Sequence, residues 1–400
     1  MQASVVALKK DADAAPGERA RALIPELRKR AAEAEQLRRA PRESVELVRQ
    51  AGLLRTILPR CCGGEAHSMR AHLDVISALA EGCSSTSWVV GVWHAHTWLM
   101  GHFSEEAQKD VYANGPDVIV SAVIAPRGRA VRQADGSFVL GGFWPFGSGC
   151  QHSQWLLLGG ELFDEKGEKL DEGDFLVPTS AVEIKDDWFM AGLAGTGSNS
   201  IVAKDLKIPA HRFLSLPGLI DGKTPGAKAG DEDWLSRAQA VPVLALCLVG
   251  GSLGLARDAL AEFKRAVVGK KVQYTAHVID EWIPAQIALG HAAAMIGAAE
   301  LVAYKAADDI DDFARRGAAM PMEMRARIRM DCCYVVRTLM EAVDKLFAFA
   351  GASALSLRGS LQRDFRDLHA TNLHGLMQME ASAEIYGRVL LGKEPNTPII

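Results

Sequence analysis

Residues 142–155 read Gly-Phe-Trp-Pro-Phe-Gly-Ser-Gly-Cys-Gln-His-Ser-Gln-Trp. Ser148 lies between two glycines, so it offers a hydroxyl and exposed backbone amides where the chain can approach a planar ligand closely. Taken alone, a stretch of this kind also fits an ordinary strand-to-turn transition. The elements on either side of it decide which interpretation holds.

The stretch lies in a β-rich part of the chain. Between about residues 118 and 213, short runs rich in Val, Ile, Leu and Phe alternate with Gly, Asp and Pro. Asp135-Gly136 is a two-residue hairpin signal. We therefore predict a β domain over residues 116–215, with strands at 118–124, 130–134, 137–143, 155–162, 174–178 and 200–206.

Helical patterns flank this domain. Apolar residues at three- and four-residue spacing in 20–34 and 44–54 predict an N-terminal helical domain over residues 1–115, in which Ser68 caps a helix. A polar linker at 216–233 leads to a C-terminal domain, residues 234–400. Its four long helical stretches, which predict a helical bundle, are 234–268, 274–315, 321–350 and 358–392.

Composition narrows the class of protein. The 400 residues are 48% hydrophobic and carry a net charge of -4 with both signs interspersed, which argues against nucleic acid as a partner. The start of the chain has no apolar core of signal-peptide length, and the apolar run 240–255 is broken by Pro242, so we expect no export and no membrane span. Seven cysteines without zinc-ligand spacing favour free thiols in the cytoplasm and no metal.

The order helical domain, β domain, helical bundle resembles the acyl-CoA dehydrogenase fold over almost the whole chain. That resemblance implies an α+β protein whose central domain is a β-barrel or sandwich. The segments that carry it are 192–198 with 205–210, 144–149, and 351–353 with 361–367.

Within this fold the chain is more similar to the oxygenase components of two-component flavin monooxygenases, which act on p-hydroxyphenylacetate and on steroid-derived phenols. The similarity is carried by residues 93–98, 125–128 and 142–155, and by Arg366-Asp367 followed by His374. It implies a homotetramer that hydroxylates a small aromatic substrate through a flavin hydroperoxide, using O2 and reduced FMN or FAD. The chain has no nicotinamide-binding motif, so we expect a separate flavin reductase as partner.

His374 is the most informative position. Acyl-CoA dehydrogenases carry a Glu-Gly pair there, whose glutamate is the catalytic base, and this chain has His374-Gly375. A histidine titrates near neutrality and suits deprotonation of a phenol, so the resemblance implies that His374 is catalytic. Without the resemblance, a buried structural histidine would be the default interpretation.

The resemblance also implies a flavin site. It places Ser148 at the reactive edge of the flavin, with Trp144, Phe146 and Gly149 beside the ring. Arg363 and Arg366 are candidates for the flavin phosphate, because guanidinium groups bind phosphate in a bidentate manner. Lys270 and Lys271 are also candidates, although simple solvation explains them better. FMN and FAD both remain open.

An aromatic-rich helix supplies candidates for substrate binding. Trp93, His94, His96 and Trp98 combine apolar walls with a few polar groups, as an aromatic substrate requires. A spacing of two places the histidines on different helix faces, and we favour His96 as the catalytic one. A packed helix with incidental histidines explains the pattern equally well.

Three alternatives remain at this point. The first is N- or S-oxygenation in the same flavin site. The second is an acyl-CoA dehydrogenase with a displaced base, for which Glu380 and Glu384 are candidates. The third is a helical assembly protein without activity.

Overall fold

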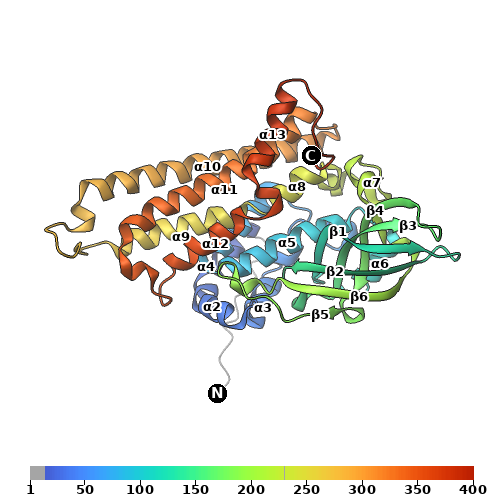
Figure 1. The fold of residues 1–400 in the computed structure, drawn as a ribbon, viewed down its shortest axis with the longest axis horizontal. Helices are drawn as coiled ribbons and strands as arrows, with labels where there is room; N and C mark the ends of the chain where they lie inside the picture. The colour runs from blue at the N-terminus through green and yellow to red at the C-terminus, as the bar shows by residue number, and fades with distance from the viewer. Residues whose placement is uncertain (1–13, 229) are drawn as a thin grey trace, which may run out of the picture.

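The computed structural model describes residues 14–228 and 230–400, and it has the predicted order of helices, β-sheet and helices (Figure 1). Ser68 accepts a hydrogen bond from the Ala71 amide, which confirms the predicted N-cap. The N-terminal helices are α1 (Pro16–Arg21), α2 (Ile24–Leu37), α3 (Arg42–Gln50), α4 (Met69–Gly82), α5 (Ser84–Met100) and α6 (Glu105–Tyr112).

One seven-stranded sheet follows, in the order β5-β6-β2-β1-β3-β4-β7. Phe138 on β2 packs against Phe175 on β4, with ring centroids 5.6 Å apart, although two strands separate β2 from β4 in the sheet. The sheet must therefore curl strongly, in agreement with the expected barrel-like domain. Its strands are β1 (Val120–Arg132), β2 (Phe138–Gly147), β3 (Trp155–Phe163), β4 (Lys169–Pro178), β5 (Glu183–Ile184), β6 (Asn199–Ile208) and β7 (Phe213–Ser215).

The two predicted strands 118–124 and 130–134 are one long strand, β1, which is irregular between Val123 and Gly128. Side chains alternate between the two faces of the sheet. On β4, Phe175 and Val177 belong to the core inside the curl, whereas Leu176 belongs to the core shared with the helices. Asp174, two residues before Leu176, consequently lies on the helix-facing side.

The predicted C-terminal stretch 321–350 is a single helix, whereas the other three stretches are longer than the helices they contain. Stretch 234–268 contains two helices, α10 starts only at Ile283, and stretch 358–392 is interrupted by a 3-10 turn at Gly375–Met377. A short helix, α7 (Leu216–Ile220), lies in the predicted linker. The C-terminal helices are α8 (Ala240–Leu246), α9 (Gly250–Ala266), α10 (Ile283–Arg316), α11 (Met322–Ala350), α12 (Leu361–Asn372) and α13 (Met379–Leu390).

Two stretches, Ala240–Ala266 and Ile283–Arg316, are long and apolar enough to cross a membrane by length and composition alone. The apolar window of the first is 83% buried inside the protein, as expected of a core helix. The window of the second is only 28% buried, so α10 exposes an apolar face in the single chain.

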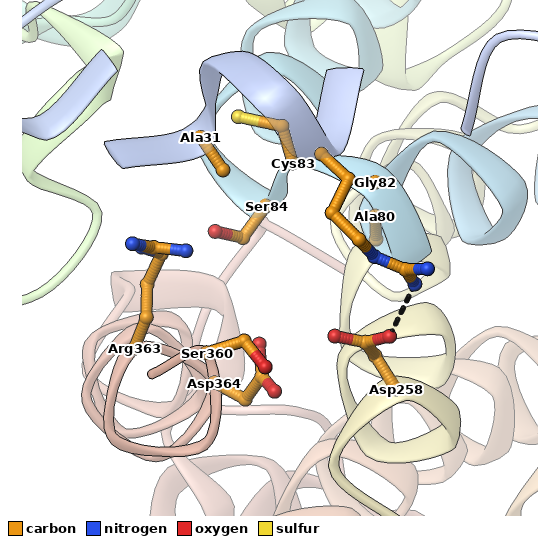
Figure 2. A pocket seen from close by; sticks show the side chains of 10 residues that line it. Ala31, Ala80, Gly82, Cys83, Ser84, Asp258, Ser360, Arg363 and Asp364 are labelled. Atoms are coloured by element: carbon orange, nitrogen blue, oxygen red, sulfur yellow. Dashed lines mark hydrogen bonds and ion pairs between the residues drawn. The ribbon is translucent and has the colours of Figure 1, made fainter. Parts of the chain in front are cut away.

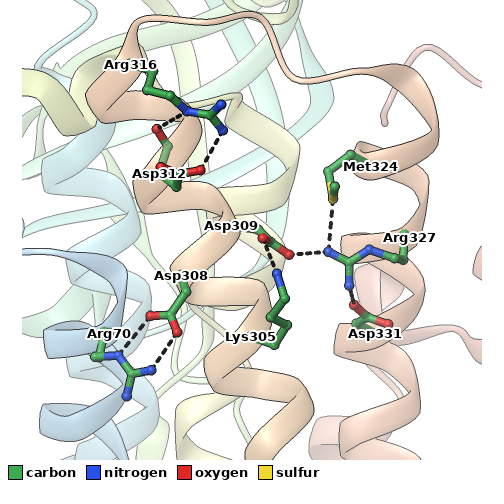
Figure 3. A network of polar contacts seen from close by, with 9 residues as sticks. All are labelled: Arg70, Lys305, Asp308, Asp309, Asp312, Arg316, Met324, Arg327 and Asp331. Atoms are coloured by element: carbon green, nitrogen blue, oxygen red, sulfur yellow. Dashed lines mark hydrogen bonds and ion pairs between the residues drawn. The ribbon is translucent and has the colours of Figure 1, made fainter.

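Ion pairs cross the outer surface of the bundle (Figure 3). Arg70 on α4 pairs with Asp308 on α10 at 2.6 Å, and Arg327 on α11 pairs with Asp309 on α10 at 2.5 Å. The Arg70 and Asp308 side chains are about half exposed, and such pairs add little stability. The buried apolar faces of the helices therefore supply most of the stability.

A buried carboxylate joins the three parts of the chain. Asp367 on α12 is 1% exposed and accepts hydrogen bonds from the hydroxyl of Ser84, at the start of α5, and from the amide of Leu193, between β5 and β6. The Leu193 bond measures 2.6 Å. Burial raises the pKa of Asp367 to about 6, although both bonds oppose that shift.

Trp144→Ala should reduce the free energy of unfolding by about 3–5 kcal/mol, because it removes a fully buried ring and the indole bond to the Gly159 carbonyl. Phe143→Ala, at the neighbouring 52% exposed position, is the matched control and should change it by no more than about 0.5–1 kcal/mol. Urea unfolding followed by circular dichroism measures both. Equal losses would show that Trp144 does not anchor the sheet core.

Candidate functional site

A large cavity lies where the sheet meets the helices, and its volume is about 1110 Å³. This exceeds the roughly 300–1,000 Å³ of most ligand sites, so the cavity has room for two planar ligands side by side. Most of its lining is apolar. The polar side chains that reach it are those of His96, Arg127, Ser148, Asp174, Thr196, Ser198, Arg366, His369 and His374.

Ser148 belongs to a chain of hydroxyl groups with a fixed direction. The Thr196 hydroxyl donates to the Leu193 carbonyl, so the Ser198 hydroxyl must donate to Thr196 over 2.7 Å and Ser148 to Ser198 over 2.8 Å. The Trp88 indole N–H donates to the Ser148 oxygen at 3.1 Å. Because the proton of Ser148 is already used, its remaining lone pair can accept a hydrogen bond from a ligand N–H.

His96 has one tautomer available in its neutral form. Its Nδ1 lies 3.1 Å from the Val120 carbonyl oxygen, which can only accept, so Nδ1 carries the proton. Nε2 is then an unprotonated lone pair on a residue that lines the cavity. Burial lowers the pKa of His96 to about 4, which keeps it neutral near pH 7.

His374 has the opposite tautomer. Its Nδ1 accepts the Leu376 amide at 3.3 Å, so the proton of the neutral ring lies on Nε2. The ring meets the Trp88 indole edge to face, with centroids 5.8 Å apart, and burial lowers its pKa to about 4. Within the cavity lining, His96 can thus accept a proton, whereas His374 donates a hydrogen bond.

Phe146 also lies at the cavity. It is 60% exposed and has a φ of 68°, a left-handed conformation that is uncommon for an aromatic residue. The pairing of β2 with β6 is irregular between Trp144 and Gly147, and this irregularity turns the Phe146 ring out of the strand pattern. Its ring meets that of Trp188 at a centroid distance of 6.0 Å.

Three residues predicted to bind substrate do not line the cavity. Trp93 donates to the Ser121 hydroxyl and Trp98 to the Leu235 carbonyl, and both rings are buried in the core. His94 contacts His72 at 3.0 Å and the Leu53 carbonyl at 2.6 Å. Every face of α5 is buried, so helical spacing could not distinguish core residues from those that line the cavity.

Two residues predicted beside the flavin ring, Trp144 and Gly149, do not line the cavity. Trp144 points into the curl of the sheet, where its indole donates to the Gly159 carbonyl at 2.7 Å. Gly149 has a φ of 67°, and a side chain there would come within 2.7 Å of the Trp93 indole. Gly149 is needed for this close approach, and we find no contact of either residue with the cavity.

The two predicted phosphate-binding arginines share one carboxylate. Glu35 pairs with Arg363 at 2.8 Å and with Arg366 at 2.6 Å, so both guanidinium groups already have a carboxylate partner. Arg366 lines the cavity, whereas Arg363 lines a second, water-sized pocket of about 20 Å³ beside Asp364 (Figure 2). Their assignment to the flavin phosphate stays a prediction.

The sequence analysis assigned no hydrogen-bonding role to Trp88, Thr196 or Ser198, although Thr196 and Ser198 stand in the stretch 192–198 that it had singled out. Their hydroxyl and indole groups meet only after β6 has paired with β2, and no local spacing reveals that pairing. The alternative base residues Glu380 and Glu384 lie on α13, after the break at Gly375, and neither lines the cavity.

Comparison with known protein families gave two matches. Residues 18–115 match the family model for the acyl-CoA dehydrogenase N-terminal domain, and residues 246–379 match the model for the C-terminal domain.

Individual relatives extend over nearly the whole chain. The oxygenase subunit HsaA of a flavin-dependent monooxygenase from Mycobacterium tuberculosis is 32% identical, over 94% of this chain and 95% of its own length. The oxygenase component of an FADH(2)-dependent resorcinol hydroxylase from Rhizobium sp. is 31% identical, over 92% of each chain. The crystal structure of XiaF from Streptomyces sp., in complex with FADH2 and glycerol, has a TM-score of 0.89 at 28% identity and covers 96% of both chains.

Nitrogen NMR of isotope-labelled histidine should show the Nδ1–H tautomer for His96 and the Nε2–H tautomer for His374. Both should stay neutral from about pH 8 to about pH 5, since burial lowers each pKa to about 4. Between the ordinary histidine pKa of about 6.5 and the folded value of about 4, the unfolded chain binds more protons than the folded protein does. The free energy of unfolding should therefore fall as the pH drops through that window. His96→Gln and His374→Gln assign the signals. The same tautomer at both sites would contradict the assignment.

Proposed function

The chain belongs to the acyl-CoA dehydrogenase family and, within it, to the flavin-dependent monooxygenases, and we propose that it is an oxygenase component that hydroxylates a phenol. The observation that carries the proposal is the pair of neutral histidines with opposite tautomers in one apolar cavity. The overall reaction converts the phenol, O2 and reduced flavin into the hydroxylated phenol, water and oxidised flavin.

The cavity fits a flavin. The exposed Phe146 ring and Trp188 offer an aromatic edge for a planar ring system, and the spare lone pair of Ser148 suits the N–H that a reduced flavin carries. Reduced flavin, when bound, supplies the electrons that activate O2. The apolar lining excludes water, which limits unproductive release of hydrogen peroxide.

We assign different roles to the two histidines. Nε2 of His96 is the acceptor for the phenolic proton, which makes the aromatic ring more nucleophilic. Nε2–H of His374 donates a hydrogen bond to an oxygen atom in the cavity and so stabilises negative charge there. Sequence reasoning favoured His374 as the base, and the Leu376 amide argues against that role because it occupies the Nδ1 lone pair.

The proposed function also includes a partner reductase, a homotetrameric assembly and a location in the cytoplasm. Relatives are named oxygenase subunits or components, so a separate reductase supplies the reduced FMN or FAD. The apolar, largely exposed face of α10, with Ile287 at 53% and Leu301 at 75% exposure, supports the proposed homotetramer. All seven cysteines are free thiols, which suits the cytoplasm.

The activity is tested by mixing the protein without oxygen with reduced FMN or FAD, and then adding oxygenated buffer and a phenol. We expect hydroxylated product that depends on the protein and accounts for most of the O2 consumed. The methyl ether of the same phenol is the control and should yield mainly hydrogen peroxide, since it has no proton for His96 to accept. Reoxidation at the rate of free flavin, with hydrogen peroxide as the sole product, would refute the proposal.

His96→Asn should lower kcat for hydroxylation by about 10²- to 10⁴-fold, as expected for loss of a general base. Activity should recover towards pH 10, because a free phenol has a pKa of about 10 and ionises without help. His374→Asn should lower kcat by about 10²- to 10³-fold without recovery at high pH.

His152→Asn, outside the cavity, is the control for both histidine variants and should leave the pH profile unchanged. Identical profiles for His96→Asn and His374→Asn would contradict the division of roles.

A further inference from the structure

Asp174 is a buried carboxyl group that the proposed chemistry does not use. It lies on β4, on the helix-facing side of the sheet, and it lines the cavity although it is only 1% exposed. Its Oδ1 is buried and has no hydrogen-bond partner, and no ion pair joins Asp174 to the described basic side chains. An unpaired buried carboxyl group destabilises the fold, and Leu176, two residues further along the same face, packs in the apolar core.

The position of Asp174 can be related to that of His96. In the sheet, Asp174 on β4 is the strand partner of Gly159 on β3. Gly159 is four residues from Trp155, and Trp155 is the strand partner of Val120 on β1. The Val120 carbonyl holds His96. Four residues of strand span about 13 Å, so Asp174 lies well away from His96 along the strands.

We propose that Asp174 is a substrate-recognition residue that accepts a hydrogen bond from a hydroxyl or amino group at the far end of an elongated phenol. This rests on the proposed function, which places the phenolic hydroxyl at His96. A carboxylate at the far end of the substrate is disfavoured, because two negative groups would meet in an apolar cavity. Specificity then arises because an analogue without the donor leaves the carboxyl group unpaired.

The electrostatics of the site agree with this role. Burial alone raises the pKa of Asp174 to about 7. Arg127 also lines the cavity but makes no ion pair with Asp174. The carboxyl group therefore offers at least one acceptor oxygen near neutral pH, whether or not it is ionised.

Three biphenyl probes of matched shape test the inference: 4,4'-dihydroxybiphenyl, its monomethyl ether, and 4'-hydroxybiphenyl-4-carboxylate. Calorimetry should show that the unaltered protein binds the diphenol about 10- to 100-fold more tightly than the ether, with the carboxylate weakest. Asp174→Leu should abolish this preference and raise Tm by about 2–4 °C, because an unpaired buried carboxyl group is replaced by an apolar side chain. Asp174→Asn, of equal size, should bind the carboxylate better than the unaltered protein does.

Glu172→Gln, on the same strand and paired with Lys169 at the surface, is the matched control and should keep the preference. An unchanged binding ratio in Asp174→Leu would overturn the inference, and so would a lower Tm, which would indicate a structural role. Calorimetry needs no flavin chemistry, so the two proposals fail separately. Diphenol binding through Asp174 without any hydroxylated product would refute the proposed function alone.

Discussion

The buried carboxylate of Asp367 holds the three parts of the chain together around the cavity. It accepts hydrogen bonds from Ser84 at the start of α5 and from the Leu193 amide beside the sheet, while α12 itself belongs to the bundle. Glu35 on α2 reinforces the junction by forming ion pairs with Arg363 and Arg366 on α12. Because these polar contacts have direction, they fix the walls of the cavity relative to one another in a way that apolar packing alone would not.

Chemistry inside the cavity depends on backbone groups rather than on the histidines alone. The Val120 carbonyl sets one imidazole as an acceptor, and the Leu376 amide sets the other as a donor. The hydroxyl chain that ends at the Leu193 carbonyl orients Ser148 in the same manner. Burial keeps the imidazoles of His96 and His374 neutral. The hydrogen bond at Nδ1 then decides whether each ring accepts or donates a proton through Nε2.

Sequence patterns predicted the order of the three parts because hydrophobic period and turn residues are local properties. They failed where a distant contact decides the outcome. The break after α12, which separates His374 from Glu380, has no proline and few breakers, so it could not be predicted from spacing. Ser148, Phe146 and His96 were predicted and do line the cavity, whereas Trp144 packs inside the curl of the sheet, next to the irregular pairing at Phe146. The tautomer of His96 depends on Val120 and the ion pair of Arg363 depends on Glu35, and both partners are far away in the chain.

We propose that one cavity holds flavin against Ser148 and a phenol against His96. The most direct measurement is a crystal structure of the protein grown without oxygen in the presence of reduced flavin and a phenol. We expect a flavin ring beside Phe146 and Ser148, with the phenolic oxygen within hydrogen-bond distance of His96 Nε2. A phenol bound elsewhere, or a flavin ring whose N–H faces away from Ser148, would contradict it.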